Sequence, residues 1–239
     1  MQHDTMDCEP IGQITKGIQP NTLVQYAIDF LQQQLPAWRD DPNRKPELTE
    51  IRLTSQLSKH LNPLAQMIQF TTEEPQDGRY SIDLSVAPIK VMFIDGWQYT
   101  NYDCFLYIEC KRLPTPTPPK AREREYVTGG KTKRSGALQR FKLGLHAHKH
   151  NLTVVIGYVQ KRSCAEWYRT INYWINDLIV GNEQDDCDWH DGEQLGQYAE
   201  DQRGLARCES DHQRQNGNDI HIVHLWIDMC SICKALCNL

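Results

Sequence analysis

The sequence predicts an α/β fold, with a central mixed β-sheet flanked by helices. Runs rich in β-branched and aromatic residues at 105–112 and 152–159 are typical of buried strands. Segments 47–61 and 136–148 repeat apolar residues at helical spacing. The predicted order is helix, strand, strand, strand, helix, strand, and this mixture of elements favours a layered α/β domain.

The elements follow one another along the chain with few long gaps. The first helix is predicted over 22–35, and Pro36 is expected to end it because proline has no backbone N–H. A hairpin with strands at 67–72 and 79–86 is predicted around Asp77-Gly78. The other predicted elements are a helix over 47–61, a short strand over 91–94, a strand over 105–112, a helix over 136–148, a strand over 152–159, a helix over 165–180 and a strand over 220–229.

Length and composition indicate one domain with additions. The chain has 239 residues, of which 39% are hydrophobic, enough for a real core. We divide it into an N-terminal helical extension over 1–46 and a main domain over 47–239. No apolar run approaches the roughly 18 residues of a membrane span, and residues 1–7 lack the features of a secretory signal. We therefore expect a cytoplasmic protein without a membrane partner.

Three charged residues interrupt the apolar runs. Asp83 lies between Ile82 and Leu84, and Glu109 and Lys111 follow the strand pattern at 105–108. Alternate residues of a strand share a face, so Glu109 and Lys111 point the same way. The alternative is that all three lie on solvated faces of edge strands. Within a buried strand, however, an unpaired charge costs free energy.

An Asp followed downstream by Glu-x-Lys resembles the active site of the PD-(D/E)XK nuclease superfamily. The resemblance covers about residues 47–160 and implies the restriction-endonuclease-like αβββαβ core. The literal Pro-Asp is missing, because Ile82 precedes Asp83. By resemblance, Asp83, Glu109 and the backbone carbonyl of Cys110 bind Mg2+ or Mn2+, and Lys111 positions the attacking water.

Two helices extend the resemblance. In many members a helix before the Asp strand adds a Glu to the site, and Glu50 is the best match, with Glu47 second. The alternative for both is a first-turn acid favoured by the helix dipole. In related nucleases a Gln or Arg on the helix after the motif faces the site or the nucleic acid. Gln139 and Arg140 are these candidates, and an exposed polar face is the alternative.

Charge is unevenly distributed around a net value of −5. Residues 111–162 hold 13 of the 26 Lys and Arg and only two acids. A basic loop over 112–135, with Lys131, Lys133 and Arg134, is therefore expected to bind phosphates, unless it is only a solvated linker. Residues 183–201 hold eight acids and no Lys or Arg, so 182–219 is predicted to be a mobile or disordered acidic insertion that screens the basic face or meets a partner.

The cysteines leave a second metal hypothesis open. In one branch of the superfamily, three late cysteines and one early cysteine hold an iron–sulfur cluster, and Cys8, Cys230, Cys233 and Cys237 match that arrangement. Free cysteines are also common as small buried hydrophobic residues. We favour this second interpretation and expect no iron–sulfur cluster.

The resemblance implies a Mg2+-dependent nuclease that hydrolyses phosphodiester bonds in DNA, with RNA left open. A small nuclease without a specificity domain suits an anti-phage defence or restriction effector, acting as a homo-oligomer or with a partner protein of such a system. Two alternatives remain: an inactive nuclease fold that only binds nucleic acid or protein, and an iron–sulfur-containing nuclease.

Overall fold

The computed structural model describes residues 22–76, 80–94, 97–115 and 122–230. The helices are α1 (Thr22–Asp40), α2 (Glu50–Leu61), α3 (Ala137–Lys142) and α4 (Cys164–Ile179). The strands are β1 (Ile68–Pro75), β2 (Ser81–Pro88), β3 (Met92–Ile94), β4 (Trp97–Tyr99), β5 (Leu106–Leu113), β6 (Leu152–Val159), β7 (Ala199–Glu200), β8 (Leu205–His212) and β9 (Ile220–Asp228).

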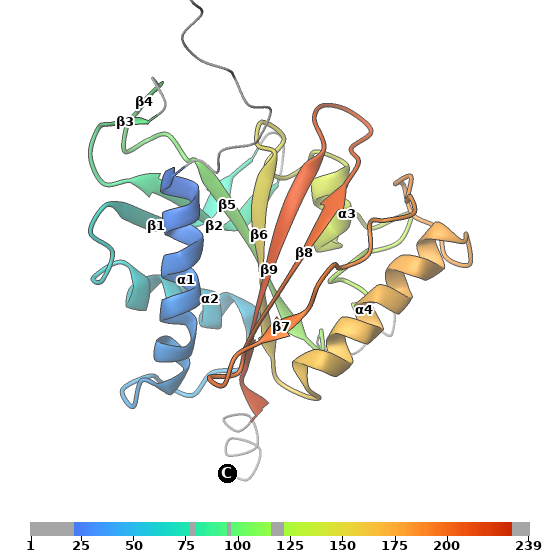
Figure 1. Ribbon diagram of the computed structural model, residues 1–239, viewed down its shortest axis with the longest axis horizontal. Helices are drawn as coiled ribbons and strands as arrows, with labels where there is room; N and C mark the ends of the chain where they lie inside the picture. The colour runs from blue at the N-terminus through green and yellow to red at the C-terminus, as the bar shows by residue number, and fades with distance from the viewer. Residues whose placement is uncertain (1–21, 77–79, 95–96, 116–121, 231–239) are drawn as a thin grey trace, which may run out of the picture.

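A seven-stranded mixed sheet runs through the middle of the molecule in the order β1-β2-β5-β6-β9-β8-β7 (Figure 1). The inner pairs β5–β6 and β6–β9 are parallel, and the outer pairs are antiparallel. Strands β3 and β4 form a separate two-stranded hairpin. The α/β class and the central mixed sheet flanked by helices are thus confirmed.

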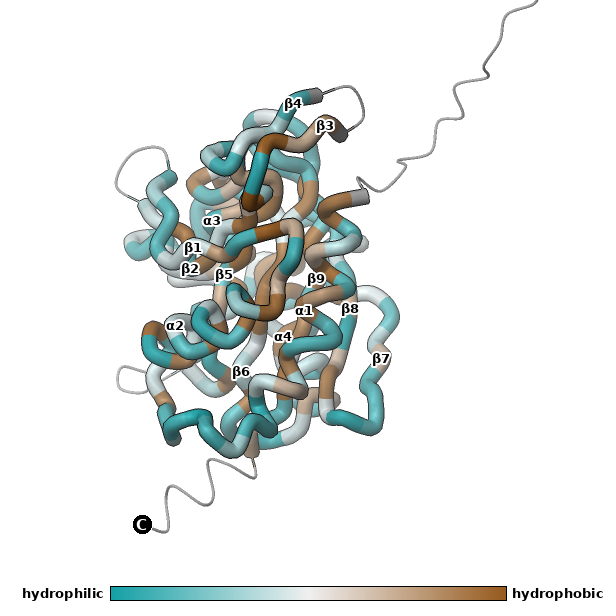
Figure 2. The backbone as a smooth tube through the Cα atoms, turned by 90° about the vertical axis from the view of Figure 1, so that its left-hand side faces the viewer, coloured by the Kyte–Doolittle hydropathy of each residue, from teal (hydrophilic) through white to brown (hydrophobic). Residues whose placement is uncertain are grey.

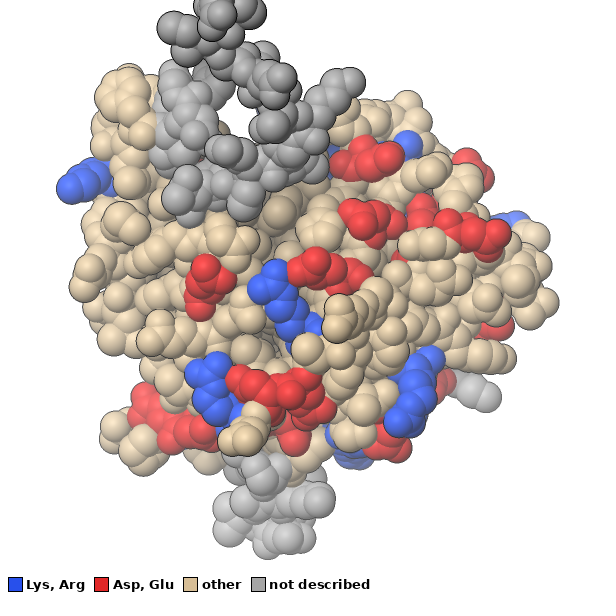
Figure 3. Space-filling view, in the orientation of Figure 1, with Lys and Arg blue, Asp and Glu red and all other residues tan. Residues whose placement is uncertain are grey.

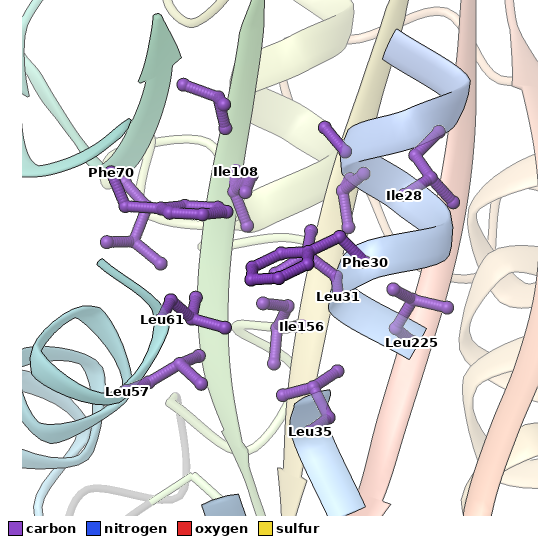
Figure 4. Close-up of a cluster of buried hydrophobic side chains, with 14 of the residues drawn as sticks. Ile28, Phe30, Leu31, Leu35, Leu57, Leu61, Phe70, Ile108, Ile156 and Leu225 are labelled. Carbon is purple, nitrogen blue, oxygen red and sulfur yellow. The ribbon is translucent and has the colours of Figure 1, made fainter. Parts of the chain in front are cut away.

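Each face of the sheet has its own hydrophobic core. On one face, α1 and α2 cover β5, β6 and β9, and Phe30 stacks on Phe70 with ring centroids 6.0 Å apart (Figure 4). On the other face, α3 and α4 pack through Phe141 and Trp174 against Val155 and Trp226. In Figure 2 the hydrophobic segments lie mainly inside and the hydrophilic ones mainly outside. The central strands are buried on both faces, which explains their nearly continuous apolar sequence.

Two predicted helix ends are wrong. Helix α1 continues through Pro36 to Asp40, because Leu35 and Trp38 are both buried in the core and hold its last turns in place. Helix α3 ends at Lys142 rather than near residue 148. Gly144 follows with a φ of +66°, a left-handed conformation that turns the chain out of the helix.

Three segment predictions also need correction. The acidic segment 182–219 is not a disordered insertion, because its residues 205–212 form β8 and pair with β9 along their whole length. Residues 22–40 are not a separate extension, since α1 is part of the core over the sheet. Within the predicted basic loop, Tyr126 and Val127 are fully buried. Each segment is held by apolar contacts to residues distant in sequence, which outweigh its polar composition.

Gly157 on β6 leaves room for the indole of Trp226, which lies opposite it on β9. A Cβ at this position would stand 2.4 Å from Cδ1 of Trp226, far inside contact distance. We expect Gly157→Ala to lower the free energy of unfolding by about 1–3 kcal/mol through overpacking. Denaturant unfolding measures this, with Thr72→Ala at an exposed strand position as the control. Equal stability of the two variants would contradict the packing described here.

Candidate active site

Strand β5 separates from β2 at its carboxyl end, and there two acidic side chains accept hydrogen bonds from the backbone N–H groups of β5. The pairing of the two strands extends only as far as Leu84 with Ile108. Beyond it, the N–H of Cys110 donates to Oδ2 of Asp83 at 2.7 Å, and the N–H of Arg112 donates to Oε2 of Glu50 at 3.0 Å. Where the strands separate, the carboxylates of Asp83 and Glu50 thus take the place of a neighbouring strand beside β5.

Lys111 joins the acidic side chains into one cluster. Its Nζ lies 2.8 Å from Oε1 of Glu109 and 3.4 Å from Oε1 of Glu50. Glu109 is 1% exposed and Lys111 is 7% exposed, so this ion pair is shielded from solvent. Glu50, on the first turn of α2, keeps 26% of its side chain exposed and forms the open side of the cluster.

Glu109 is also contacted by two basic groups from the segment after β5. Nη1 of Arg140, on α3, lies 3.2 Å from Oε1 of Glu109. Nδ1 of His146 lies 3.0 Å from Oε2, and this histidine is fully buried. Three basic side chains therefore surround one buried carboxylate. Lys111 and Arg140 both contact Oε1, whereas Oε2, beside His146, makes no hydrogen bond within the described residues.

The pKa values of the cluster follow from this arrangement. Burial, with the nearby charge of Glu109, raises the pKa of Asp83 to about 7, although Lys111 and the N–H of Cys110 act against the shift. Burial alone would raise the pKa of Glu109, but Lys111, His146 and Arg140 outweigh it and lower that pKa. Burial alone would lower the pKa of Lys111, but the charges of Glu109, Glu50 and Asp83 outweigh it and raise that pKa. Lys111 is a stable ammonium, and Asp83 is the group that titrates near neutrality.

Gln139, one of the residues predicted to face the site or the nucleic acid, is bonded to the backbone instead. Gln139 is fully buried; its Oε1 accepts from the N–H of Gly129 at 2.9 Å and its Nε2 donates to the carbonyl of Gly130 at 3.1 Å. Its amide thus holds the chain before α3 in place and does not face a ligand, which corrects its predicted role.

The basic side chains beyond Gly130 are partly engaged with the acidic segment. Nε of Arg134 lies 2.7 Å from Oδ2 of Asp186, and Nζ of Lys131 donates to Gln184 at 2.6 Å. Lys133 is exposed. The acidic segment therefore contacts the basic one, in line with the prediction that it screens the basic face.

The proposed cluster cysteines cannot be compared as a set, because Cys8, Cys233 and Cys237 lie outside the described residues. Cys230 is described; its thiol donates to the carbonyl of Arg162 at 3.1 Å. Neither cysteine interpretation is decided by this contact.

The donor set suits a hard divalent cation in its chemistry. Asp83, Glu109 and the carbonyl of Cys110 all offer oxygen, the atom that Mg2+ and Mn2+ prefer. The partial repulsion between Asp83 and Glu109 is what a dication would relieve. Within the described part of the chain, no three His, Cys, Asp or Glu side chains already form a metal cage. A cation that binds Glu109 must compete with Lys111, Arg140 and His146 for its oxygens.

Sequence reasoning missed His146, which contacts Glu109 directly. Nothing in its spacing distinguished it from His148 and His150 nearby. The turn that follows α3 places it in the core between Tyr80 and Phe141, with ring centroids 6.2 and 6.0 Å away. Only the position of that turn over the sheet identifies this histidine as a neighbour of the site.

Helices long and apolar enough to span a membrane are not found in the described part of the chain. Comparison of the chain with protein-family models, with curated proteins and with solved structures gave no match in any of the three.

Proposed function

We propose that this chain is a metal-dependent nuclease with a restriction-endonuclease-like core that hydrolyses phosphodiester bonds in DNA. The observation that carries the proposal is a cluster of charged side chains at the point where β5 separates from β2. It consists of Asp83, Glu109, Lys111 and Glu50. Side chains from two strands and a helix meet there, and their types suit phosphodiester hydrolysis. Burial, and then the charge of Glu109, raise the pKa of Asp83 to about 7, and acids with strongly shifted pKa values cluster at functional sites.

The proposed roles follow from the contacts. Asp83, Glu109 and the carbonyl of Cys110 would hold Mg2+ or Mn2+, with Glu50 as a further acid at the open side. When bound, the ion supplies Lewis acidity and lowers the pKa of water. Lys111, fixed by Glu109 and Glu50, orients that water and stabilises the negative charge that develops on the phosphate.

Arginines beside the cluster support binding of a polyanion. Arg52, Arg112 and Arg122 line a cavity of about 380 Å³ that also includes Glu50 and the exposed side chain of Ile51. Guanidinium groups bind phosphate oxygens in a bidentate manner, and a phosphate in this cavity would compete with Glu47 for Arg52 and with Glu125 for Arg122. On the face shown in Figure 3, acidic and basic side chains are interspersed and do not form a broad basic surface.

A biological role in anti-phage defence or restriction, alone or with a partner protein, fits a small nuclease of this kind, and remains part of the proposal. The fold by itself does not select among the roles that such nucleases serve.

A second candidate is a binding module that holds nucleic acid without cutting it. The observation in its favour is the pairing of Glu109, which already has Lys111, Arg140 and His146 close to its carboxylate, at 2.8, 3.2 and 3.0 Å. Such a module would retain the arginine-lined cavity and lose the need for a metal.

The direct test is a cleavage panel. The purified protein is incubated with supercoiled, linear and single-stranded DNA and with RNA, each with Mg2+, with Mn2+ or with EDTA. We expect cleavage of DNA with either metal and none with EDTA. Binding without cleavage under all conditions would support the binding module instead and contradict the nuclease.

A further inference from the structure

A second cavity, of about 370 Å³, lies between the end of α1 and the second half of α2. Its lining includes Trp38, Arg44, Lys45, Lys59 and His60. It is separate from the cluster around Glu109: along α2, Glu50 and Lys59 are about 14 Å apart at a rise of ~1.5 Å per residue. The nuclease proposal makes no use of these residues.

Hydrogen-bond donors dominate this cavity. One acid lines it, Asp41, and its Oδ2 is 3.9 Å from Nδ1 of His60, too far for a hydrogen bond. Lys45 and Lys59 are exposed at its rim. The guanidinium of Arg44 lies over the ring of Trp38, 5.1 Å from its centroid. Three cations, Arg44, Lys45 and Lys59, against one acid make the cavity electropositive, whereas burial lowers the pKa of His60.

Two buried nitrogens of the lining have no hydrogen-bond partner. The indole Nε1 of Trp38 has none, although this residue is only 1% exposed. Nε2 of His60 also has none, and 16% of that side chain is exposed. Buried donors are almost always paired in folded proteins, so an unpaired indole N–H beside a basic cavity indicates a missing acceptor.

We propose that this cavity binds a phosphate group, carried by a small phosphorylated metabolite or by a nucleic-acid backbone. The site offers the cations of Arg44, Lys45 and Lys59, and Trp38 forms part of its wall. A phosphate presents several acceptor oxygens with negative charge, which such a donor set satisfies. The cavity volume lies within the range of about 300–1,000 Å³ typical of small-molecule sites. The inference is independent of the proposed function, because it involves none of the cluster residues.

The test follows the indole N–H resonance of Trp38 during titration with sodium phosphate, at constant ionic strength adjusted with NaCl. Trp38→Phe, which lacks the indole N–H, assigns that resonance. We expect a saturable shift in the wild-type protein and about tenfold weaker binding in Lys59→Gln, since a charged hydrogen bond contributes on this scale. Lys90→Gln, at another exposed lysine, is the matched control and should bind as the wild type.

Two further titrations identify the source of the phosphate. If adenosine 5′-monophosphate shifts the Trp38 resonance and a short DNA duplex in EDTA does not, the ligand is a free metabolite. A shift with the duplex that weakens in Lys59→Gln identifies a backbone phosphate. Both results support the site. The proposal is overturned if sodium phosphate gives no saturable shift, or if Lys59→Gln and Lys90→Gln bind it equally well.

Discussion

Glu109→Gln is expected to reduce Mg2+-dependent DNA cleavage by at least about 1,000-fold, because the cluster loses both a metal ligand and the charge that fixes Lys111. The substitution keeps the shape of the side chain and removes its negative charge. Single-turnover cleavage of labelled DNA at saturating protein measures the chemical step apart from binding.

This variant also leaves Lys111, Arg140 and His146 without their common partner, so its folding needs to be checked by thermal unfolding. Asp83→Asn provides a second test, since an amide oxygen can still accept from the N–H of Cys110 and the fold should be preserved. Glu123→Gln, at an exposed acid in the basic segment, is the control and should cut as the wild type. A folded Asp83→Asn variant that cuts at the wild-type rate would exclude the proposed site.

In the absence of metal, Asp83→Asn is expected to stabilise the protein, and the gain should depend on pH. The pKa of Asp83 is raised from 3.8 to about 7 in the folded protein, by burial and then by Glu109. Ionised Asp83 therefore costs free energy in the folded state, while the unfolded chain ionises freely. The advantage of Asn should begin near pH 4, grow up to about pH 7 and then stay constant, reaching on the order of a few kcal/mol.

Denaturant unfolding in EDTA between pH 4 and pH 9 measures this difference between Asp83→Asn and the wild type. Glu123→Gln should show no such trend, because that carboxylate is exposed. Saturating Mg2+ is expected to shrink the gain, since a bound dication favours ionised Asp83. A pH-independent difference would mean that Asp83 is ionised in the folded protein throughout this range.

The sequence by itself determined the elements whose pattern is local. The β5, β6 and β9 strands and the α4 helix lie within a residue or two of their predicted positions, since their apolar residues repeat with the period of the element they form. The grouping of Glu109 with Lys111 follows from alternation along one strand, whereas Asp83 and Glu50 are candidates through the resemblance to the nuclease superfamily.

Only the tertiary structure decided the features that depend on distant partners. Strand β8 forms in an acidic segment because it pairs with β9, and α1 passes Pro36 because Trp38 is buried beneath it. His146 reaches Glu109 through a turn after α3, while Gln139, one residue from Arg140, bonds to the backbone instead. Composition and periodicity report what neighbours along the chain favour, whereas these contacts join residues that folding alone brings together, and their combined free energy outweighs the local preference.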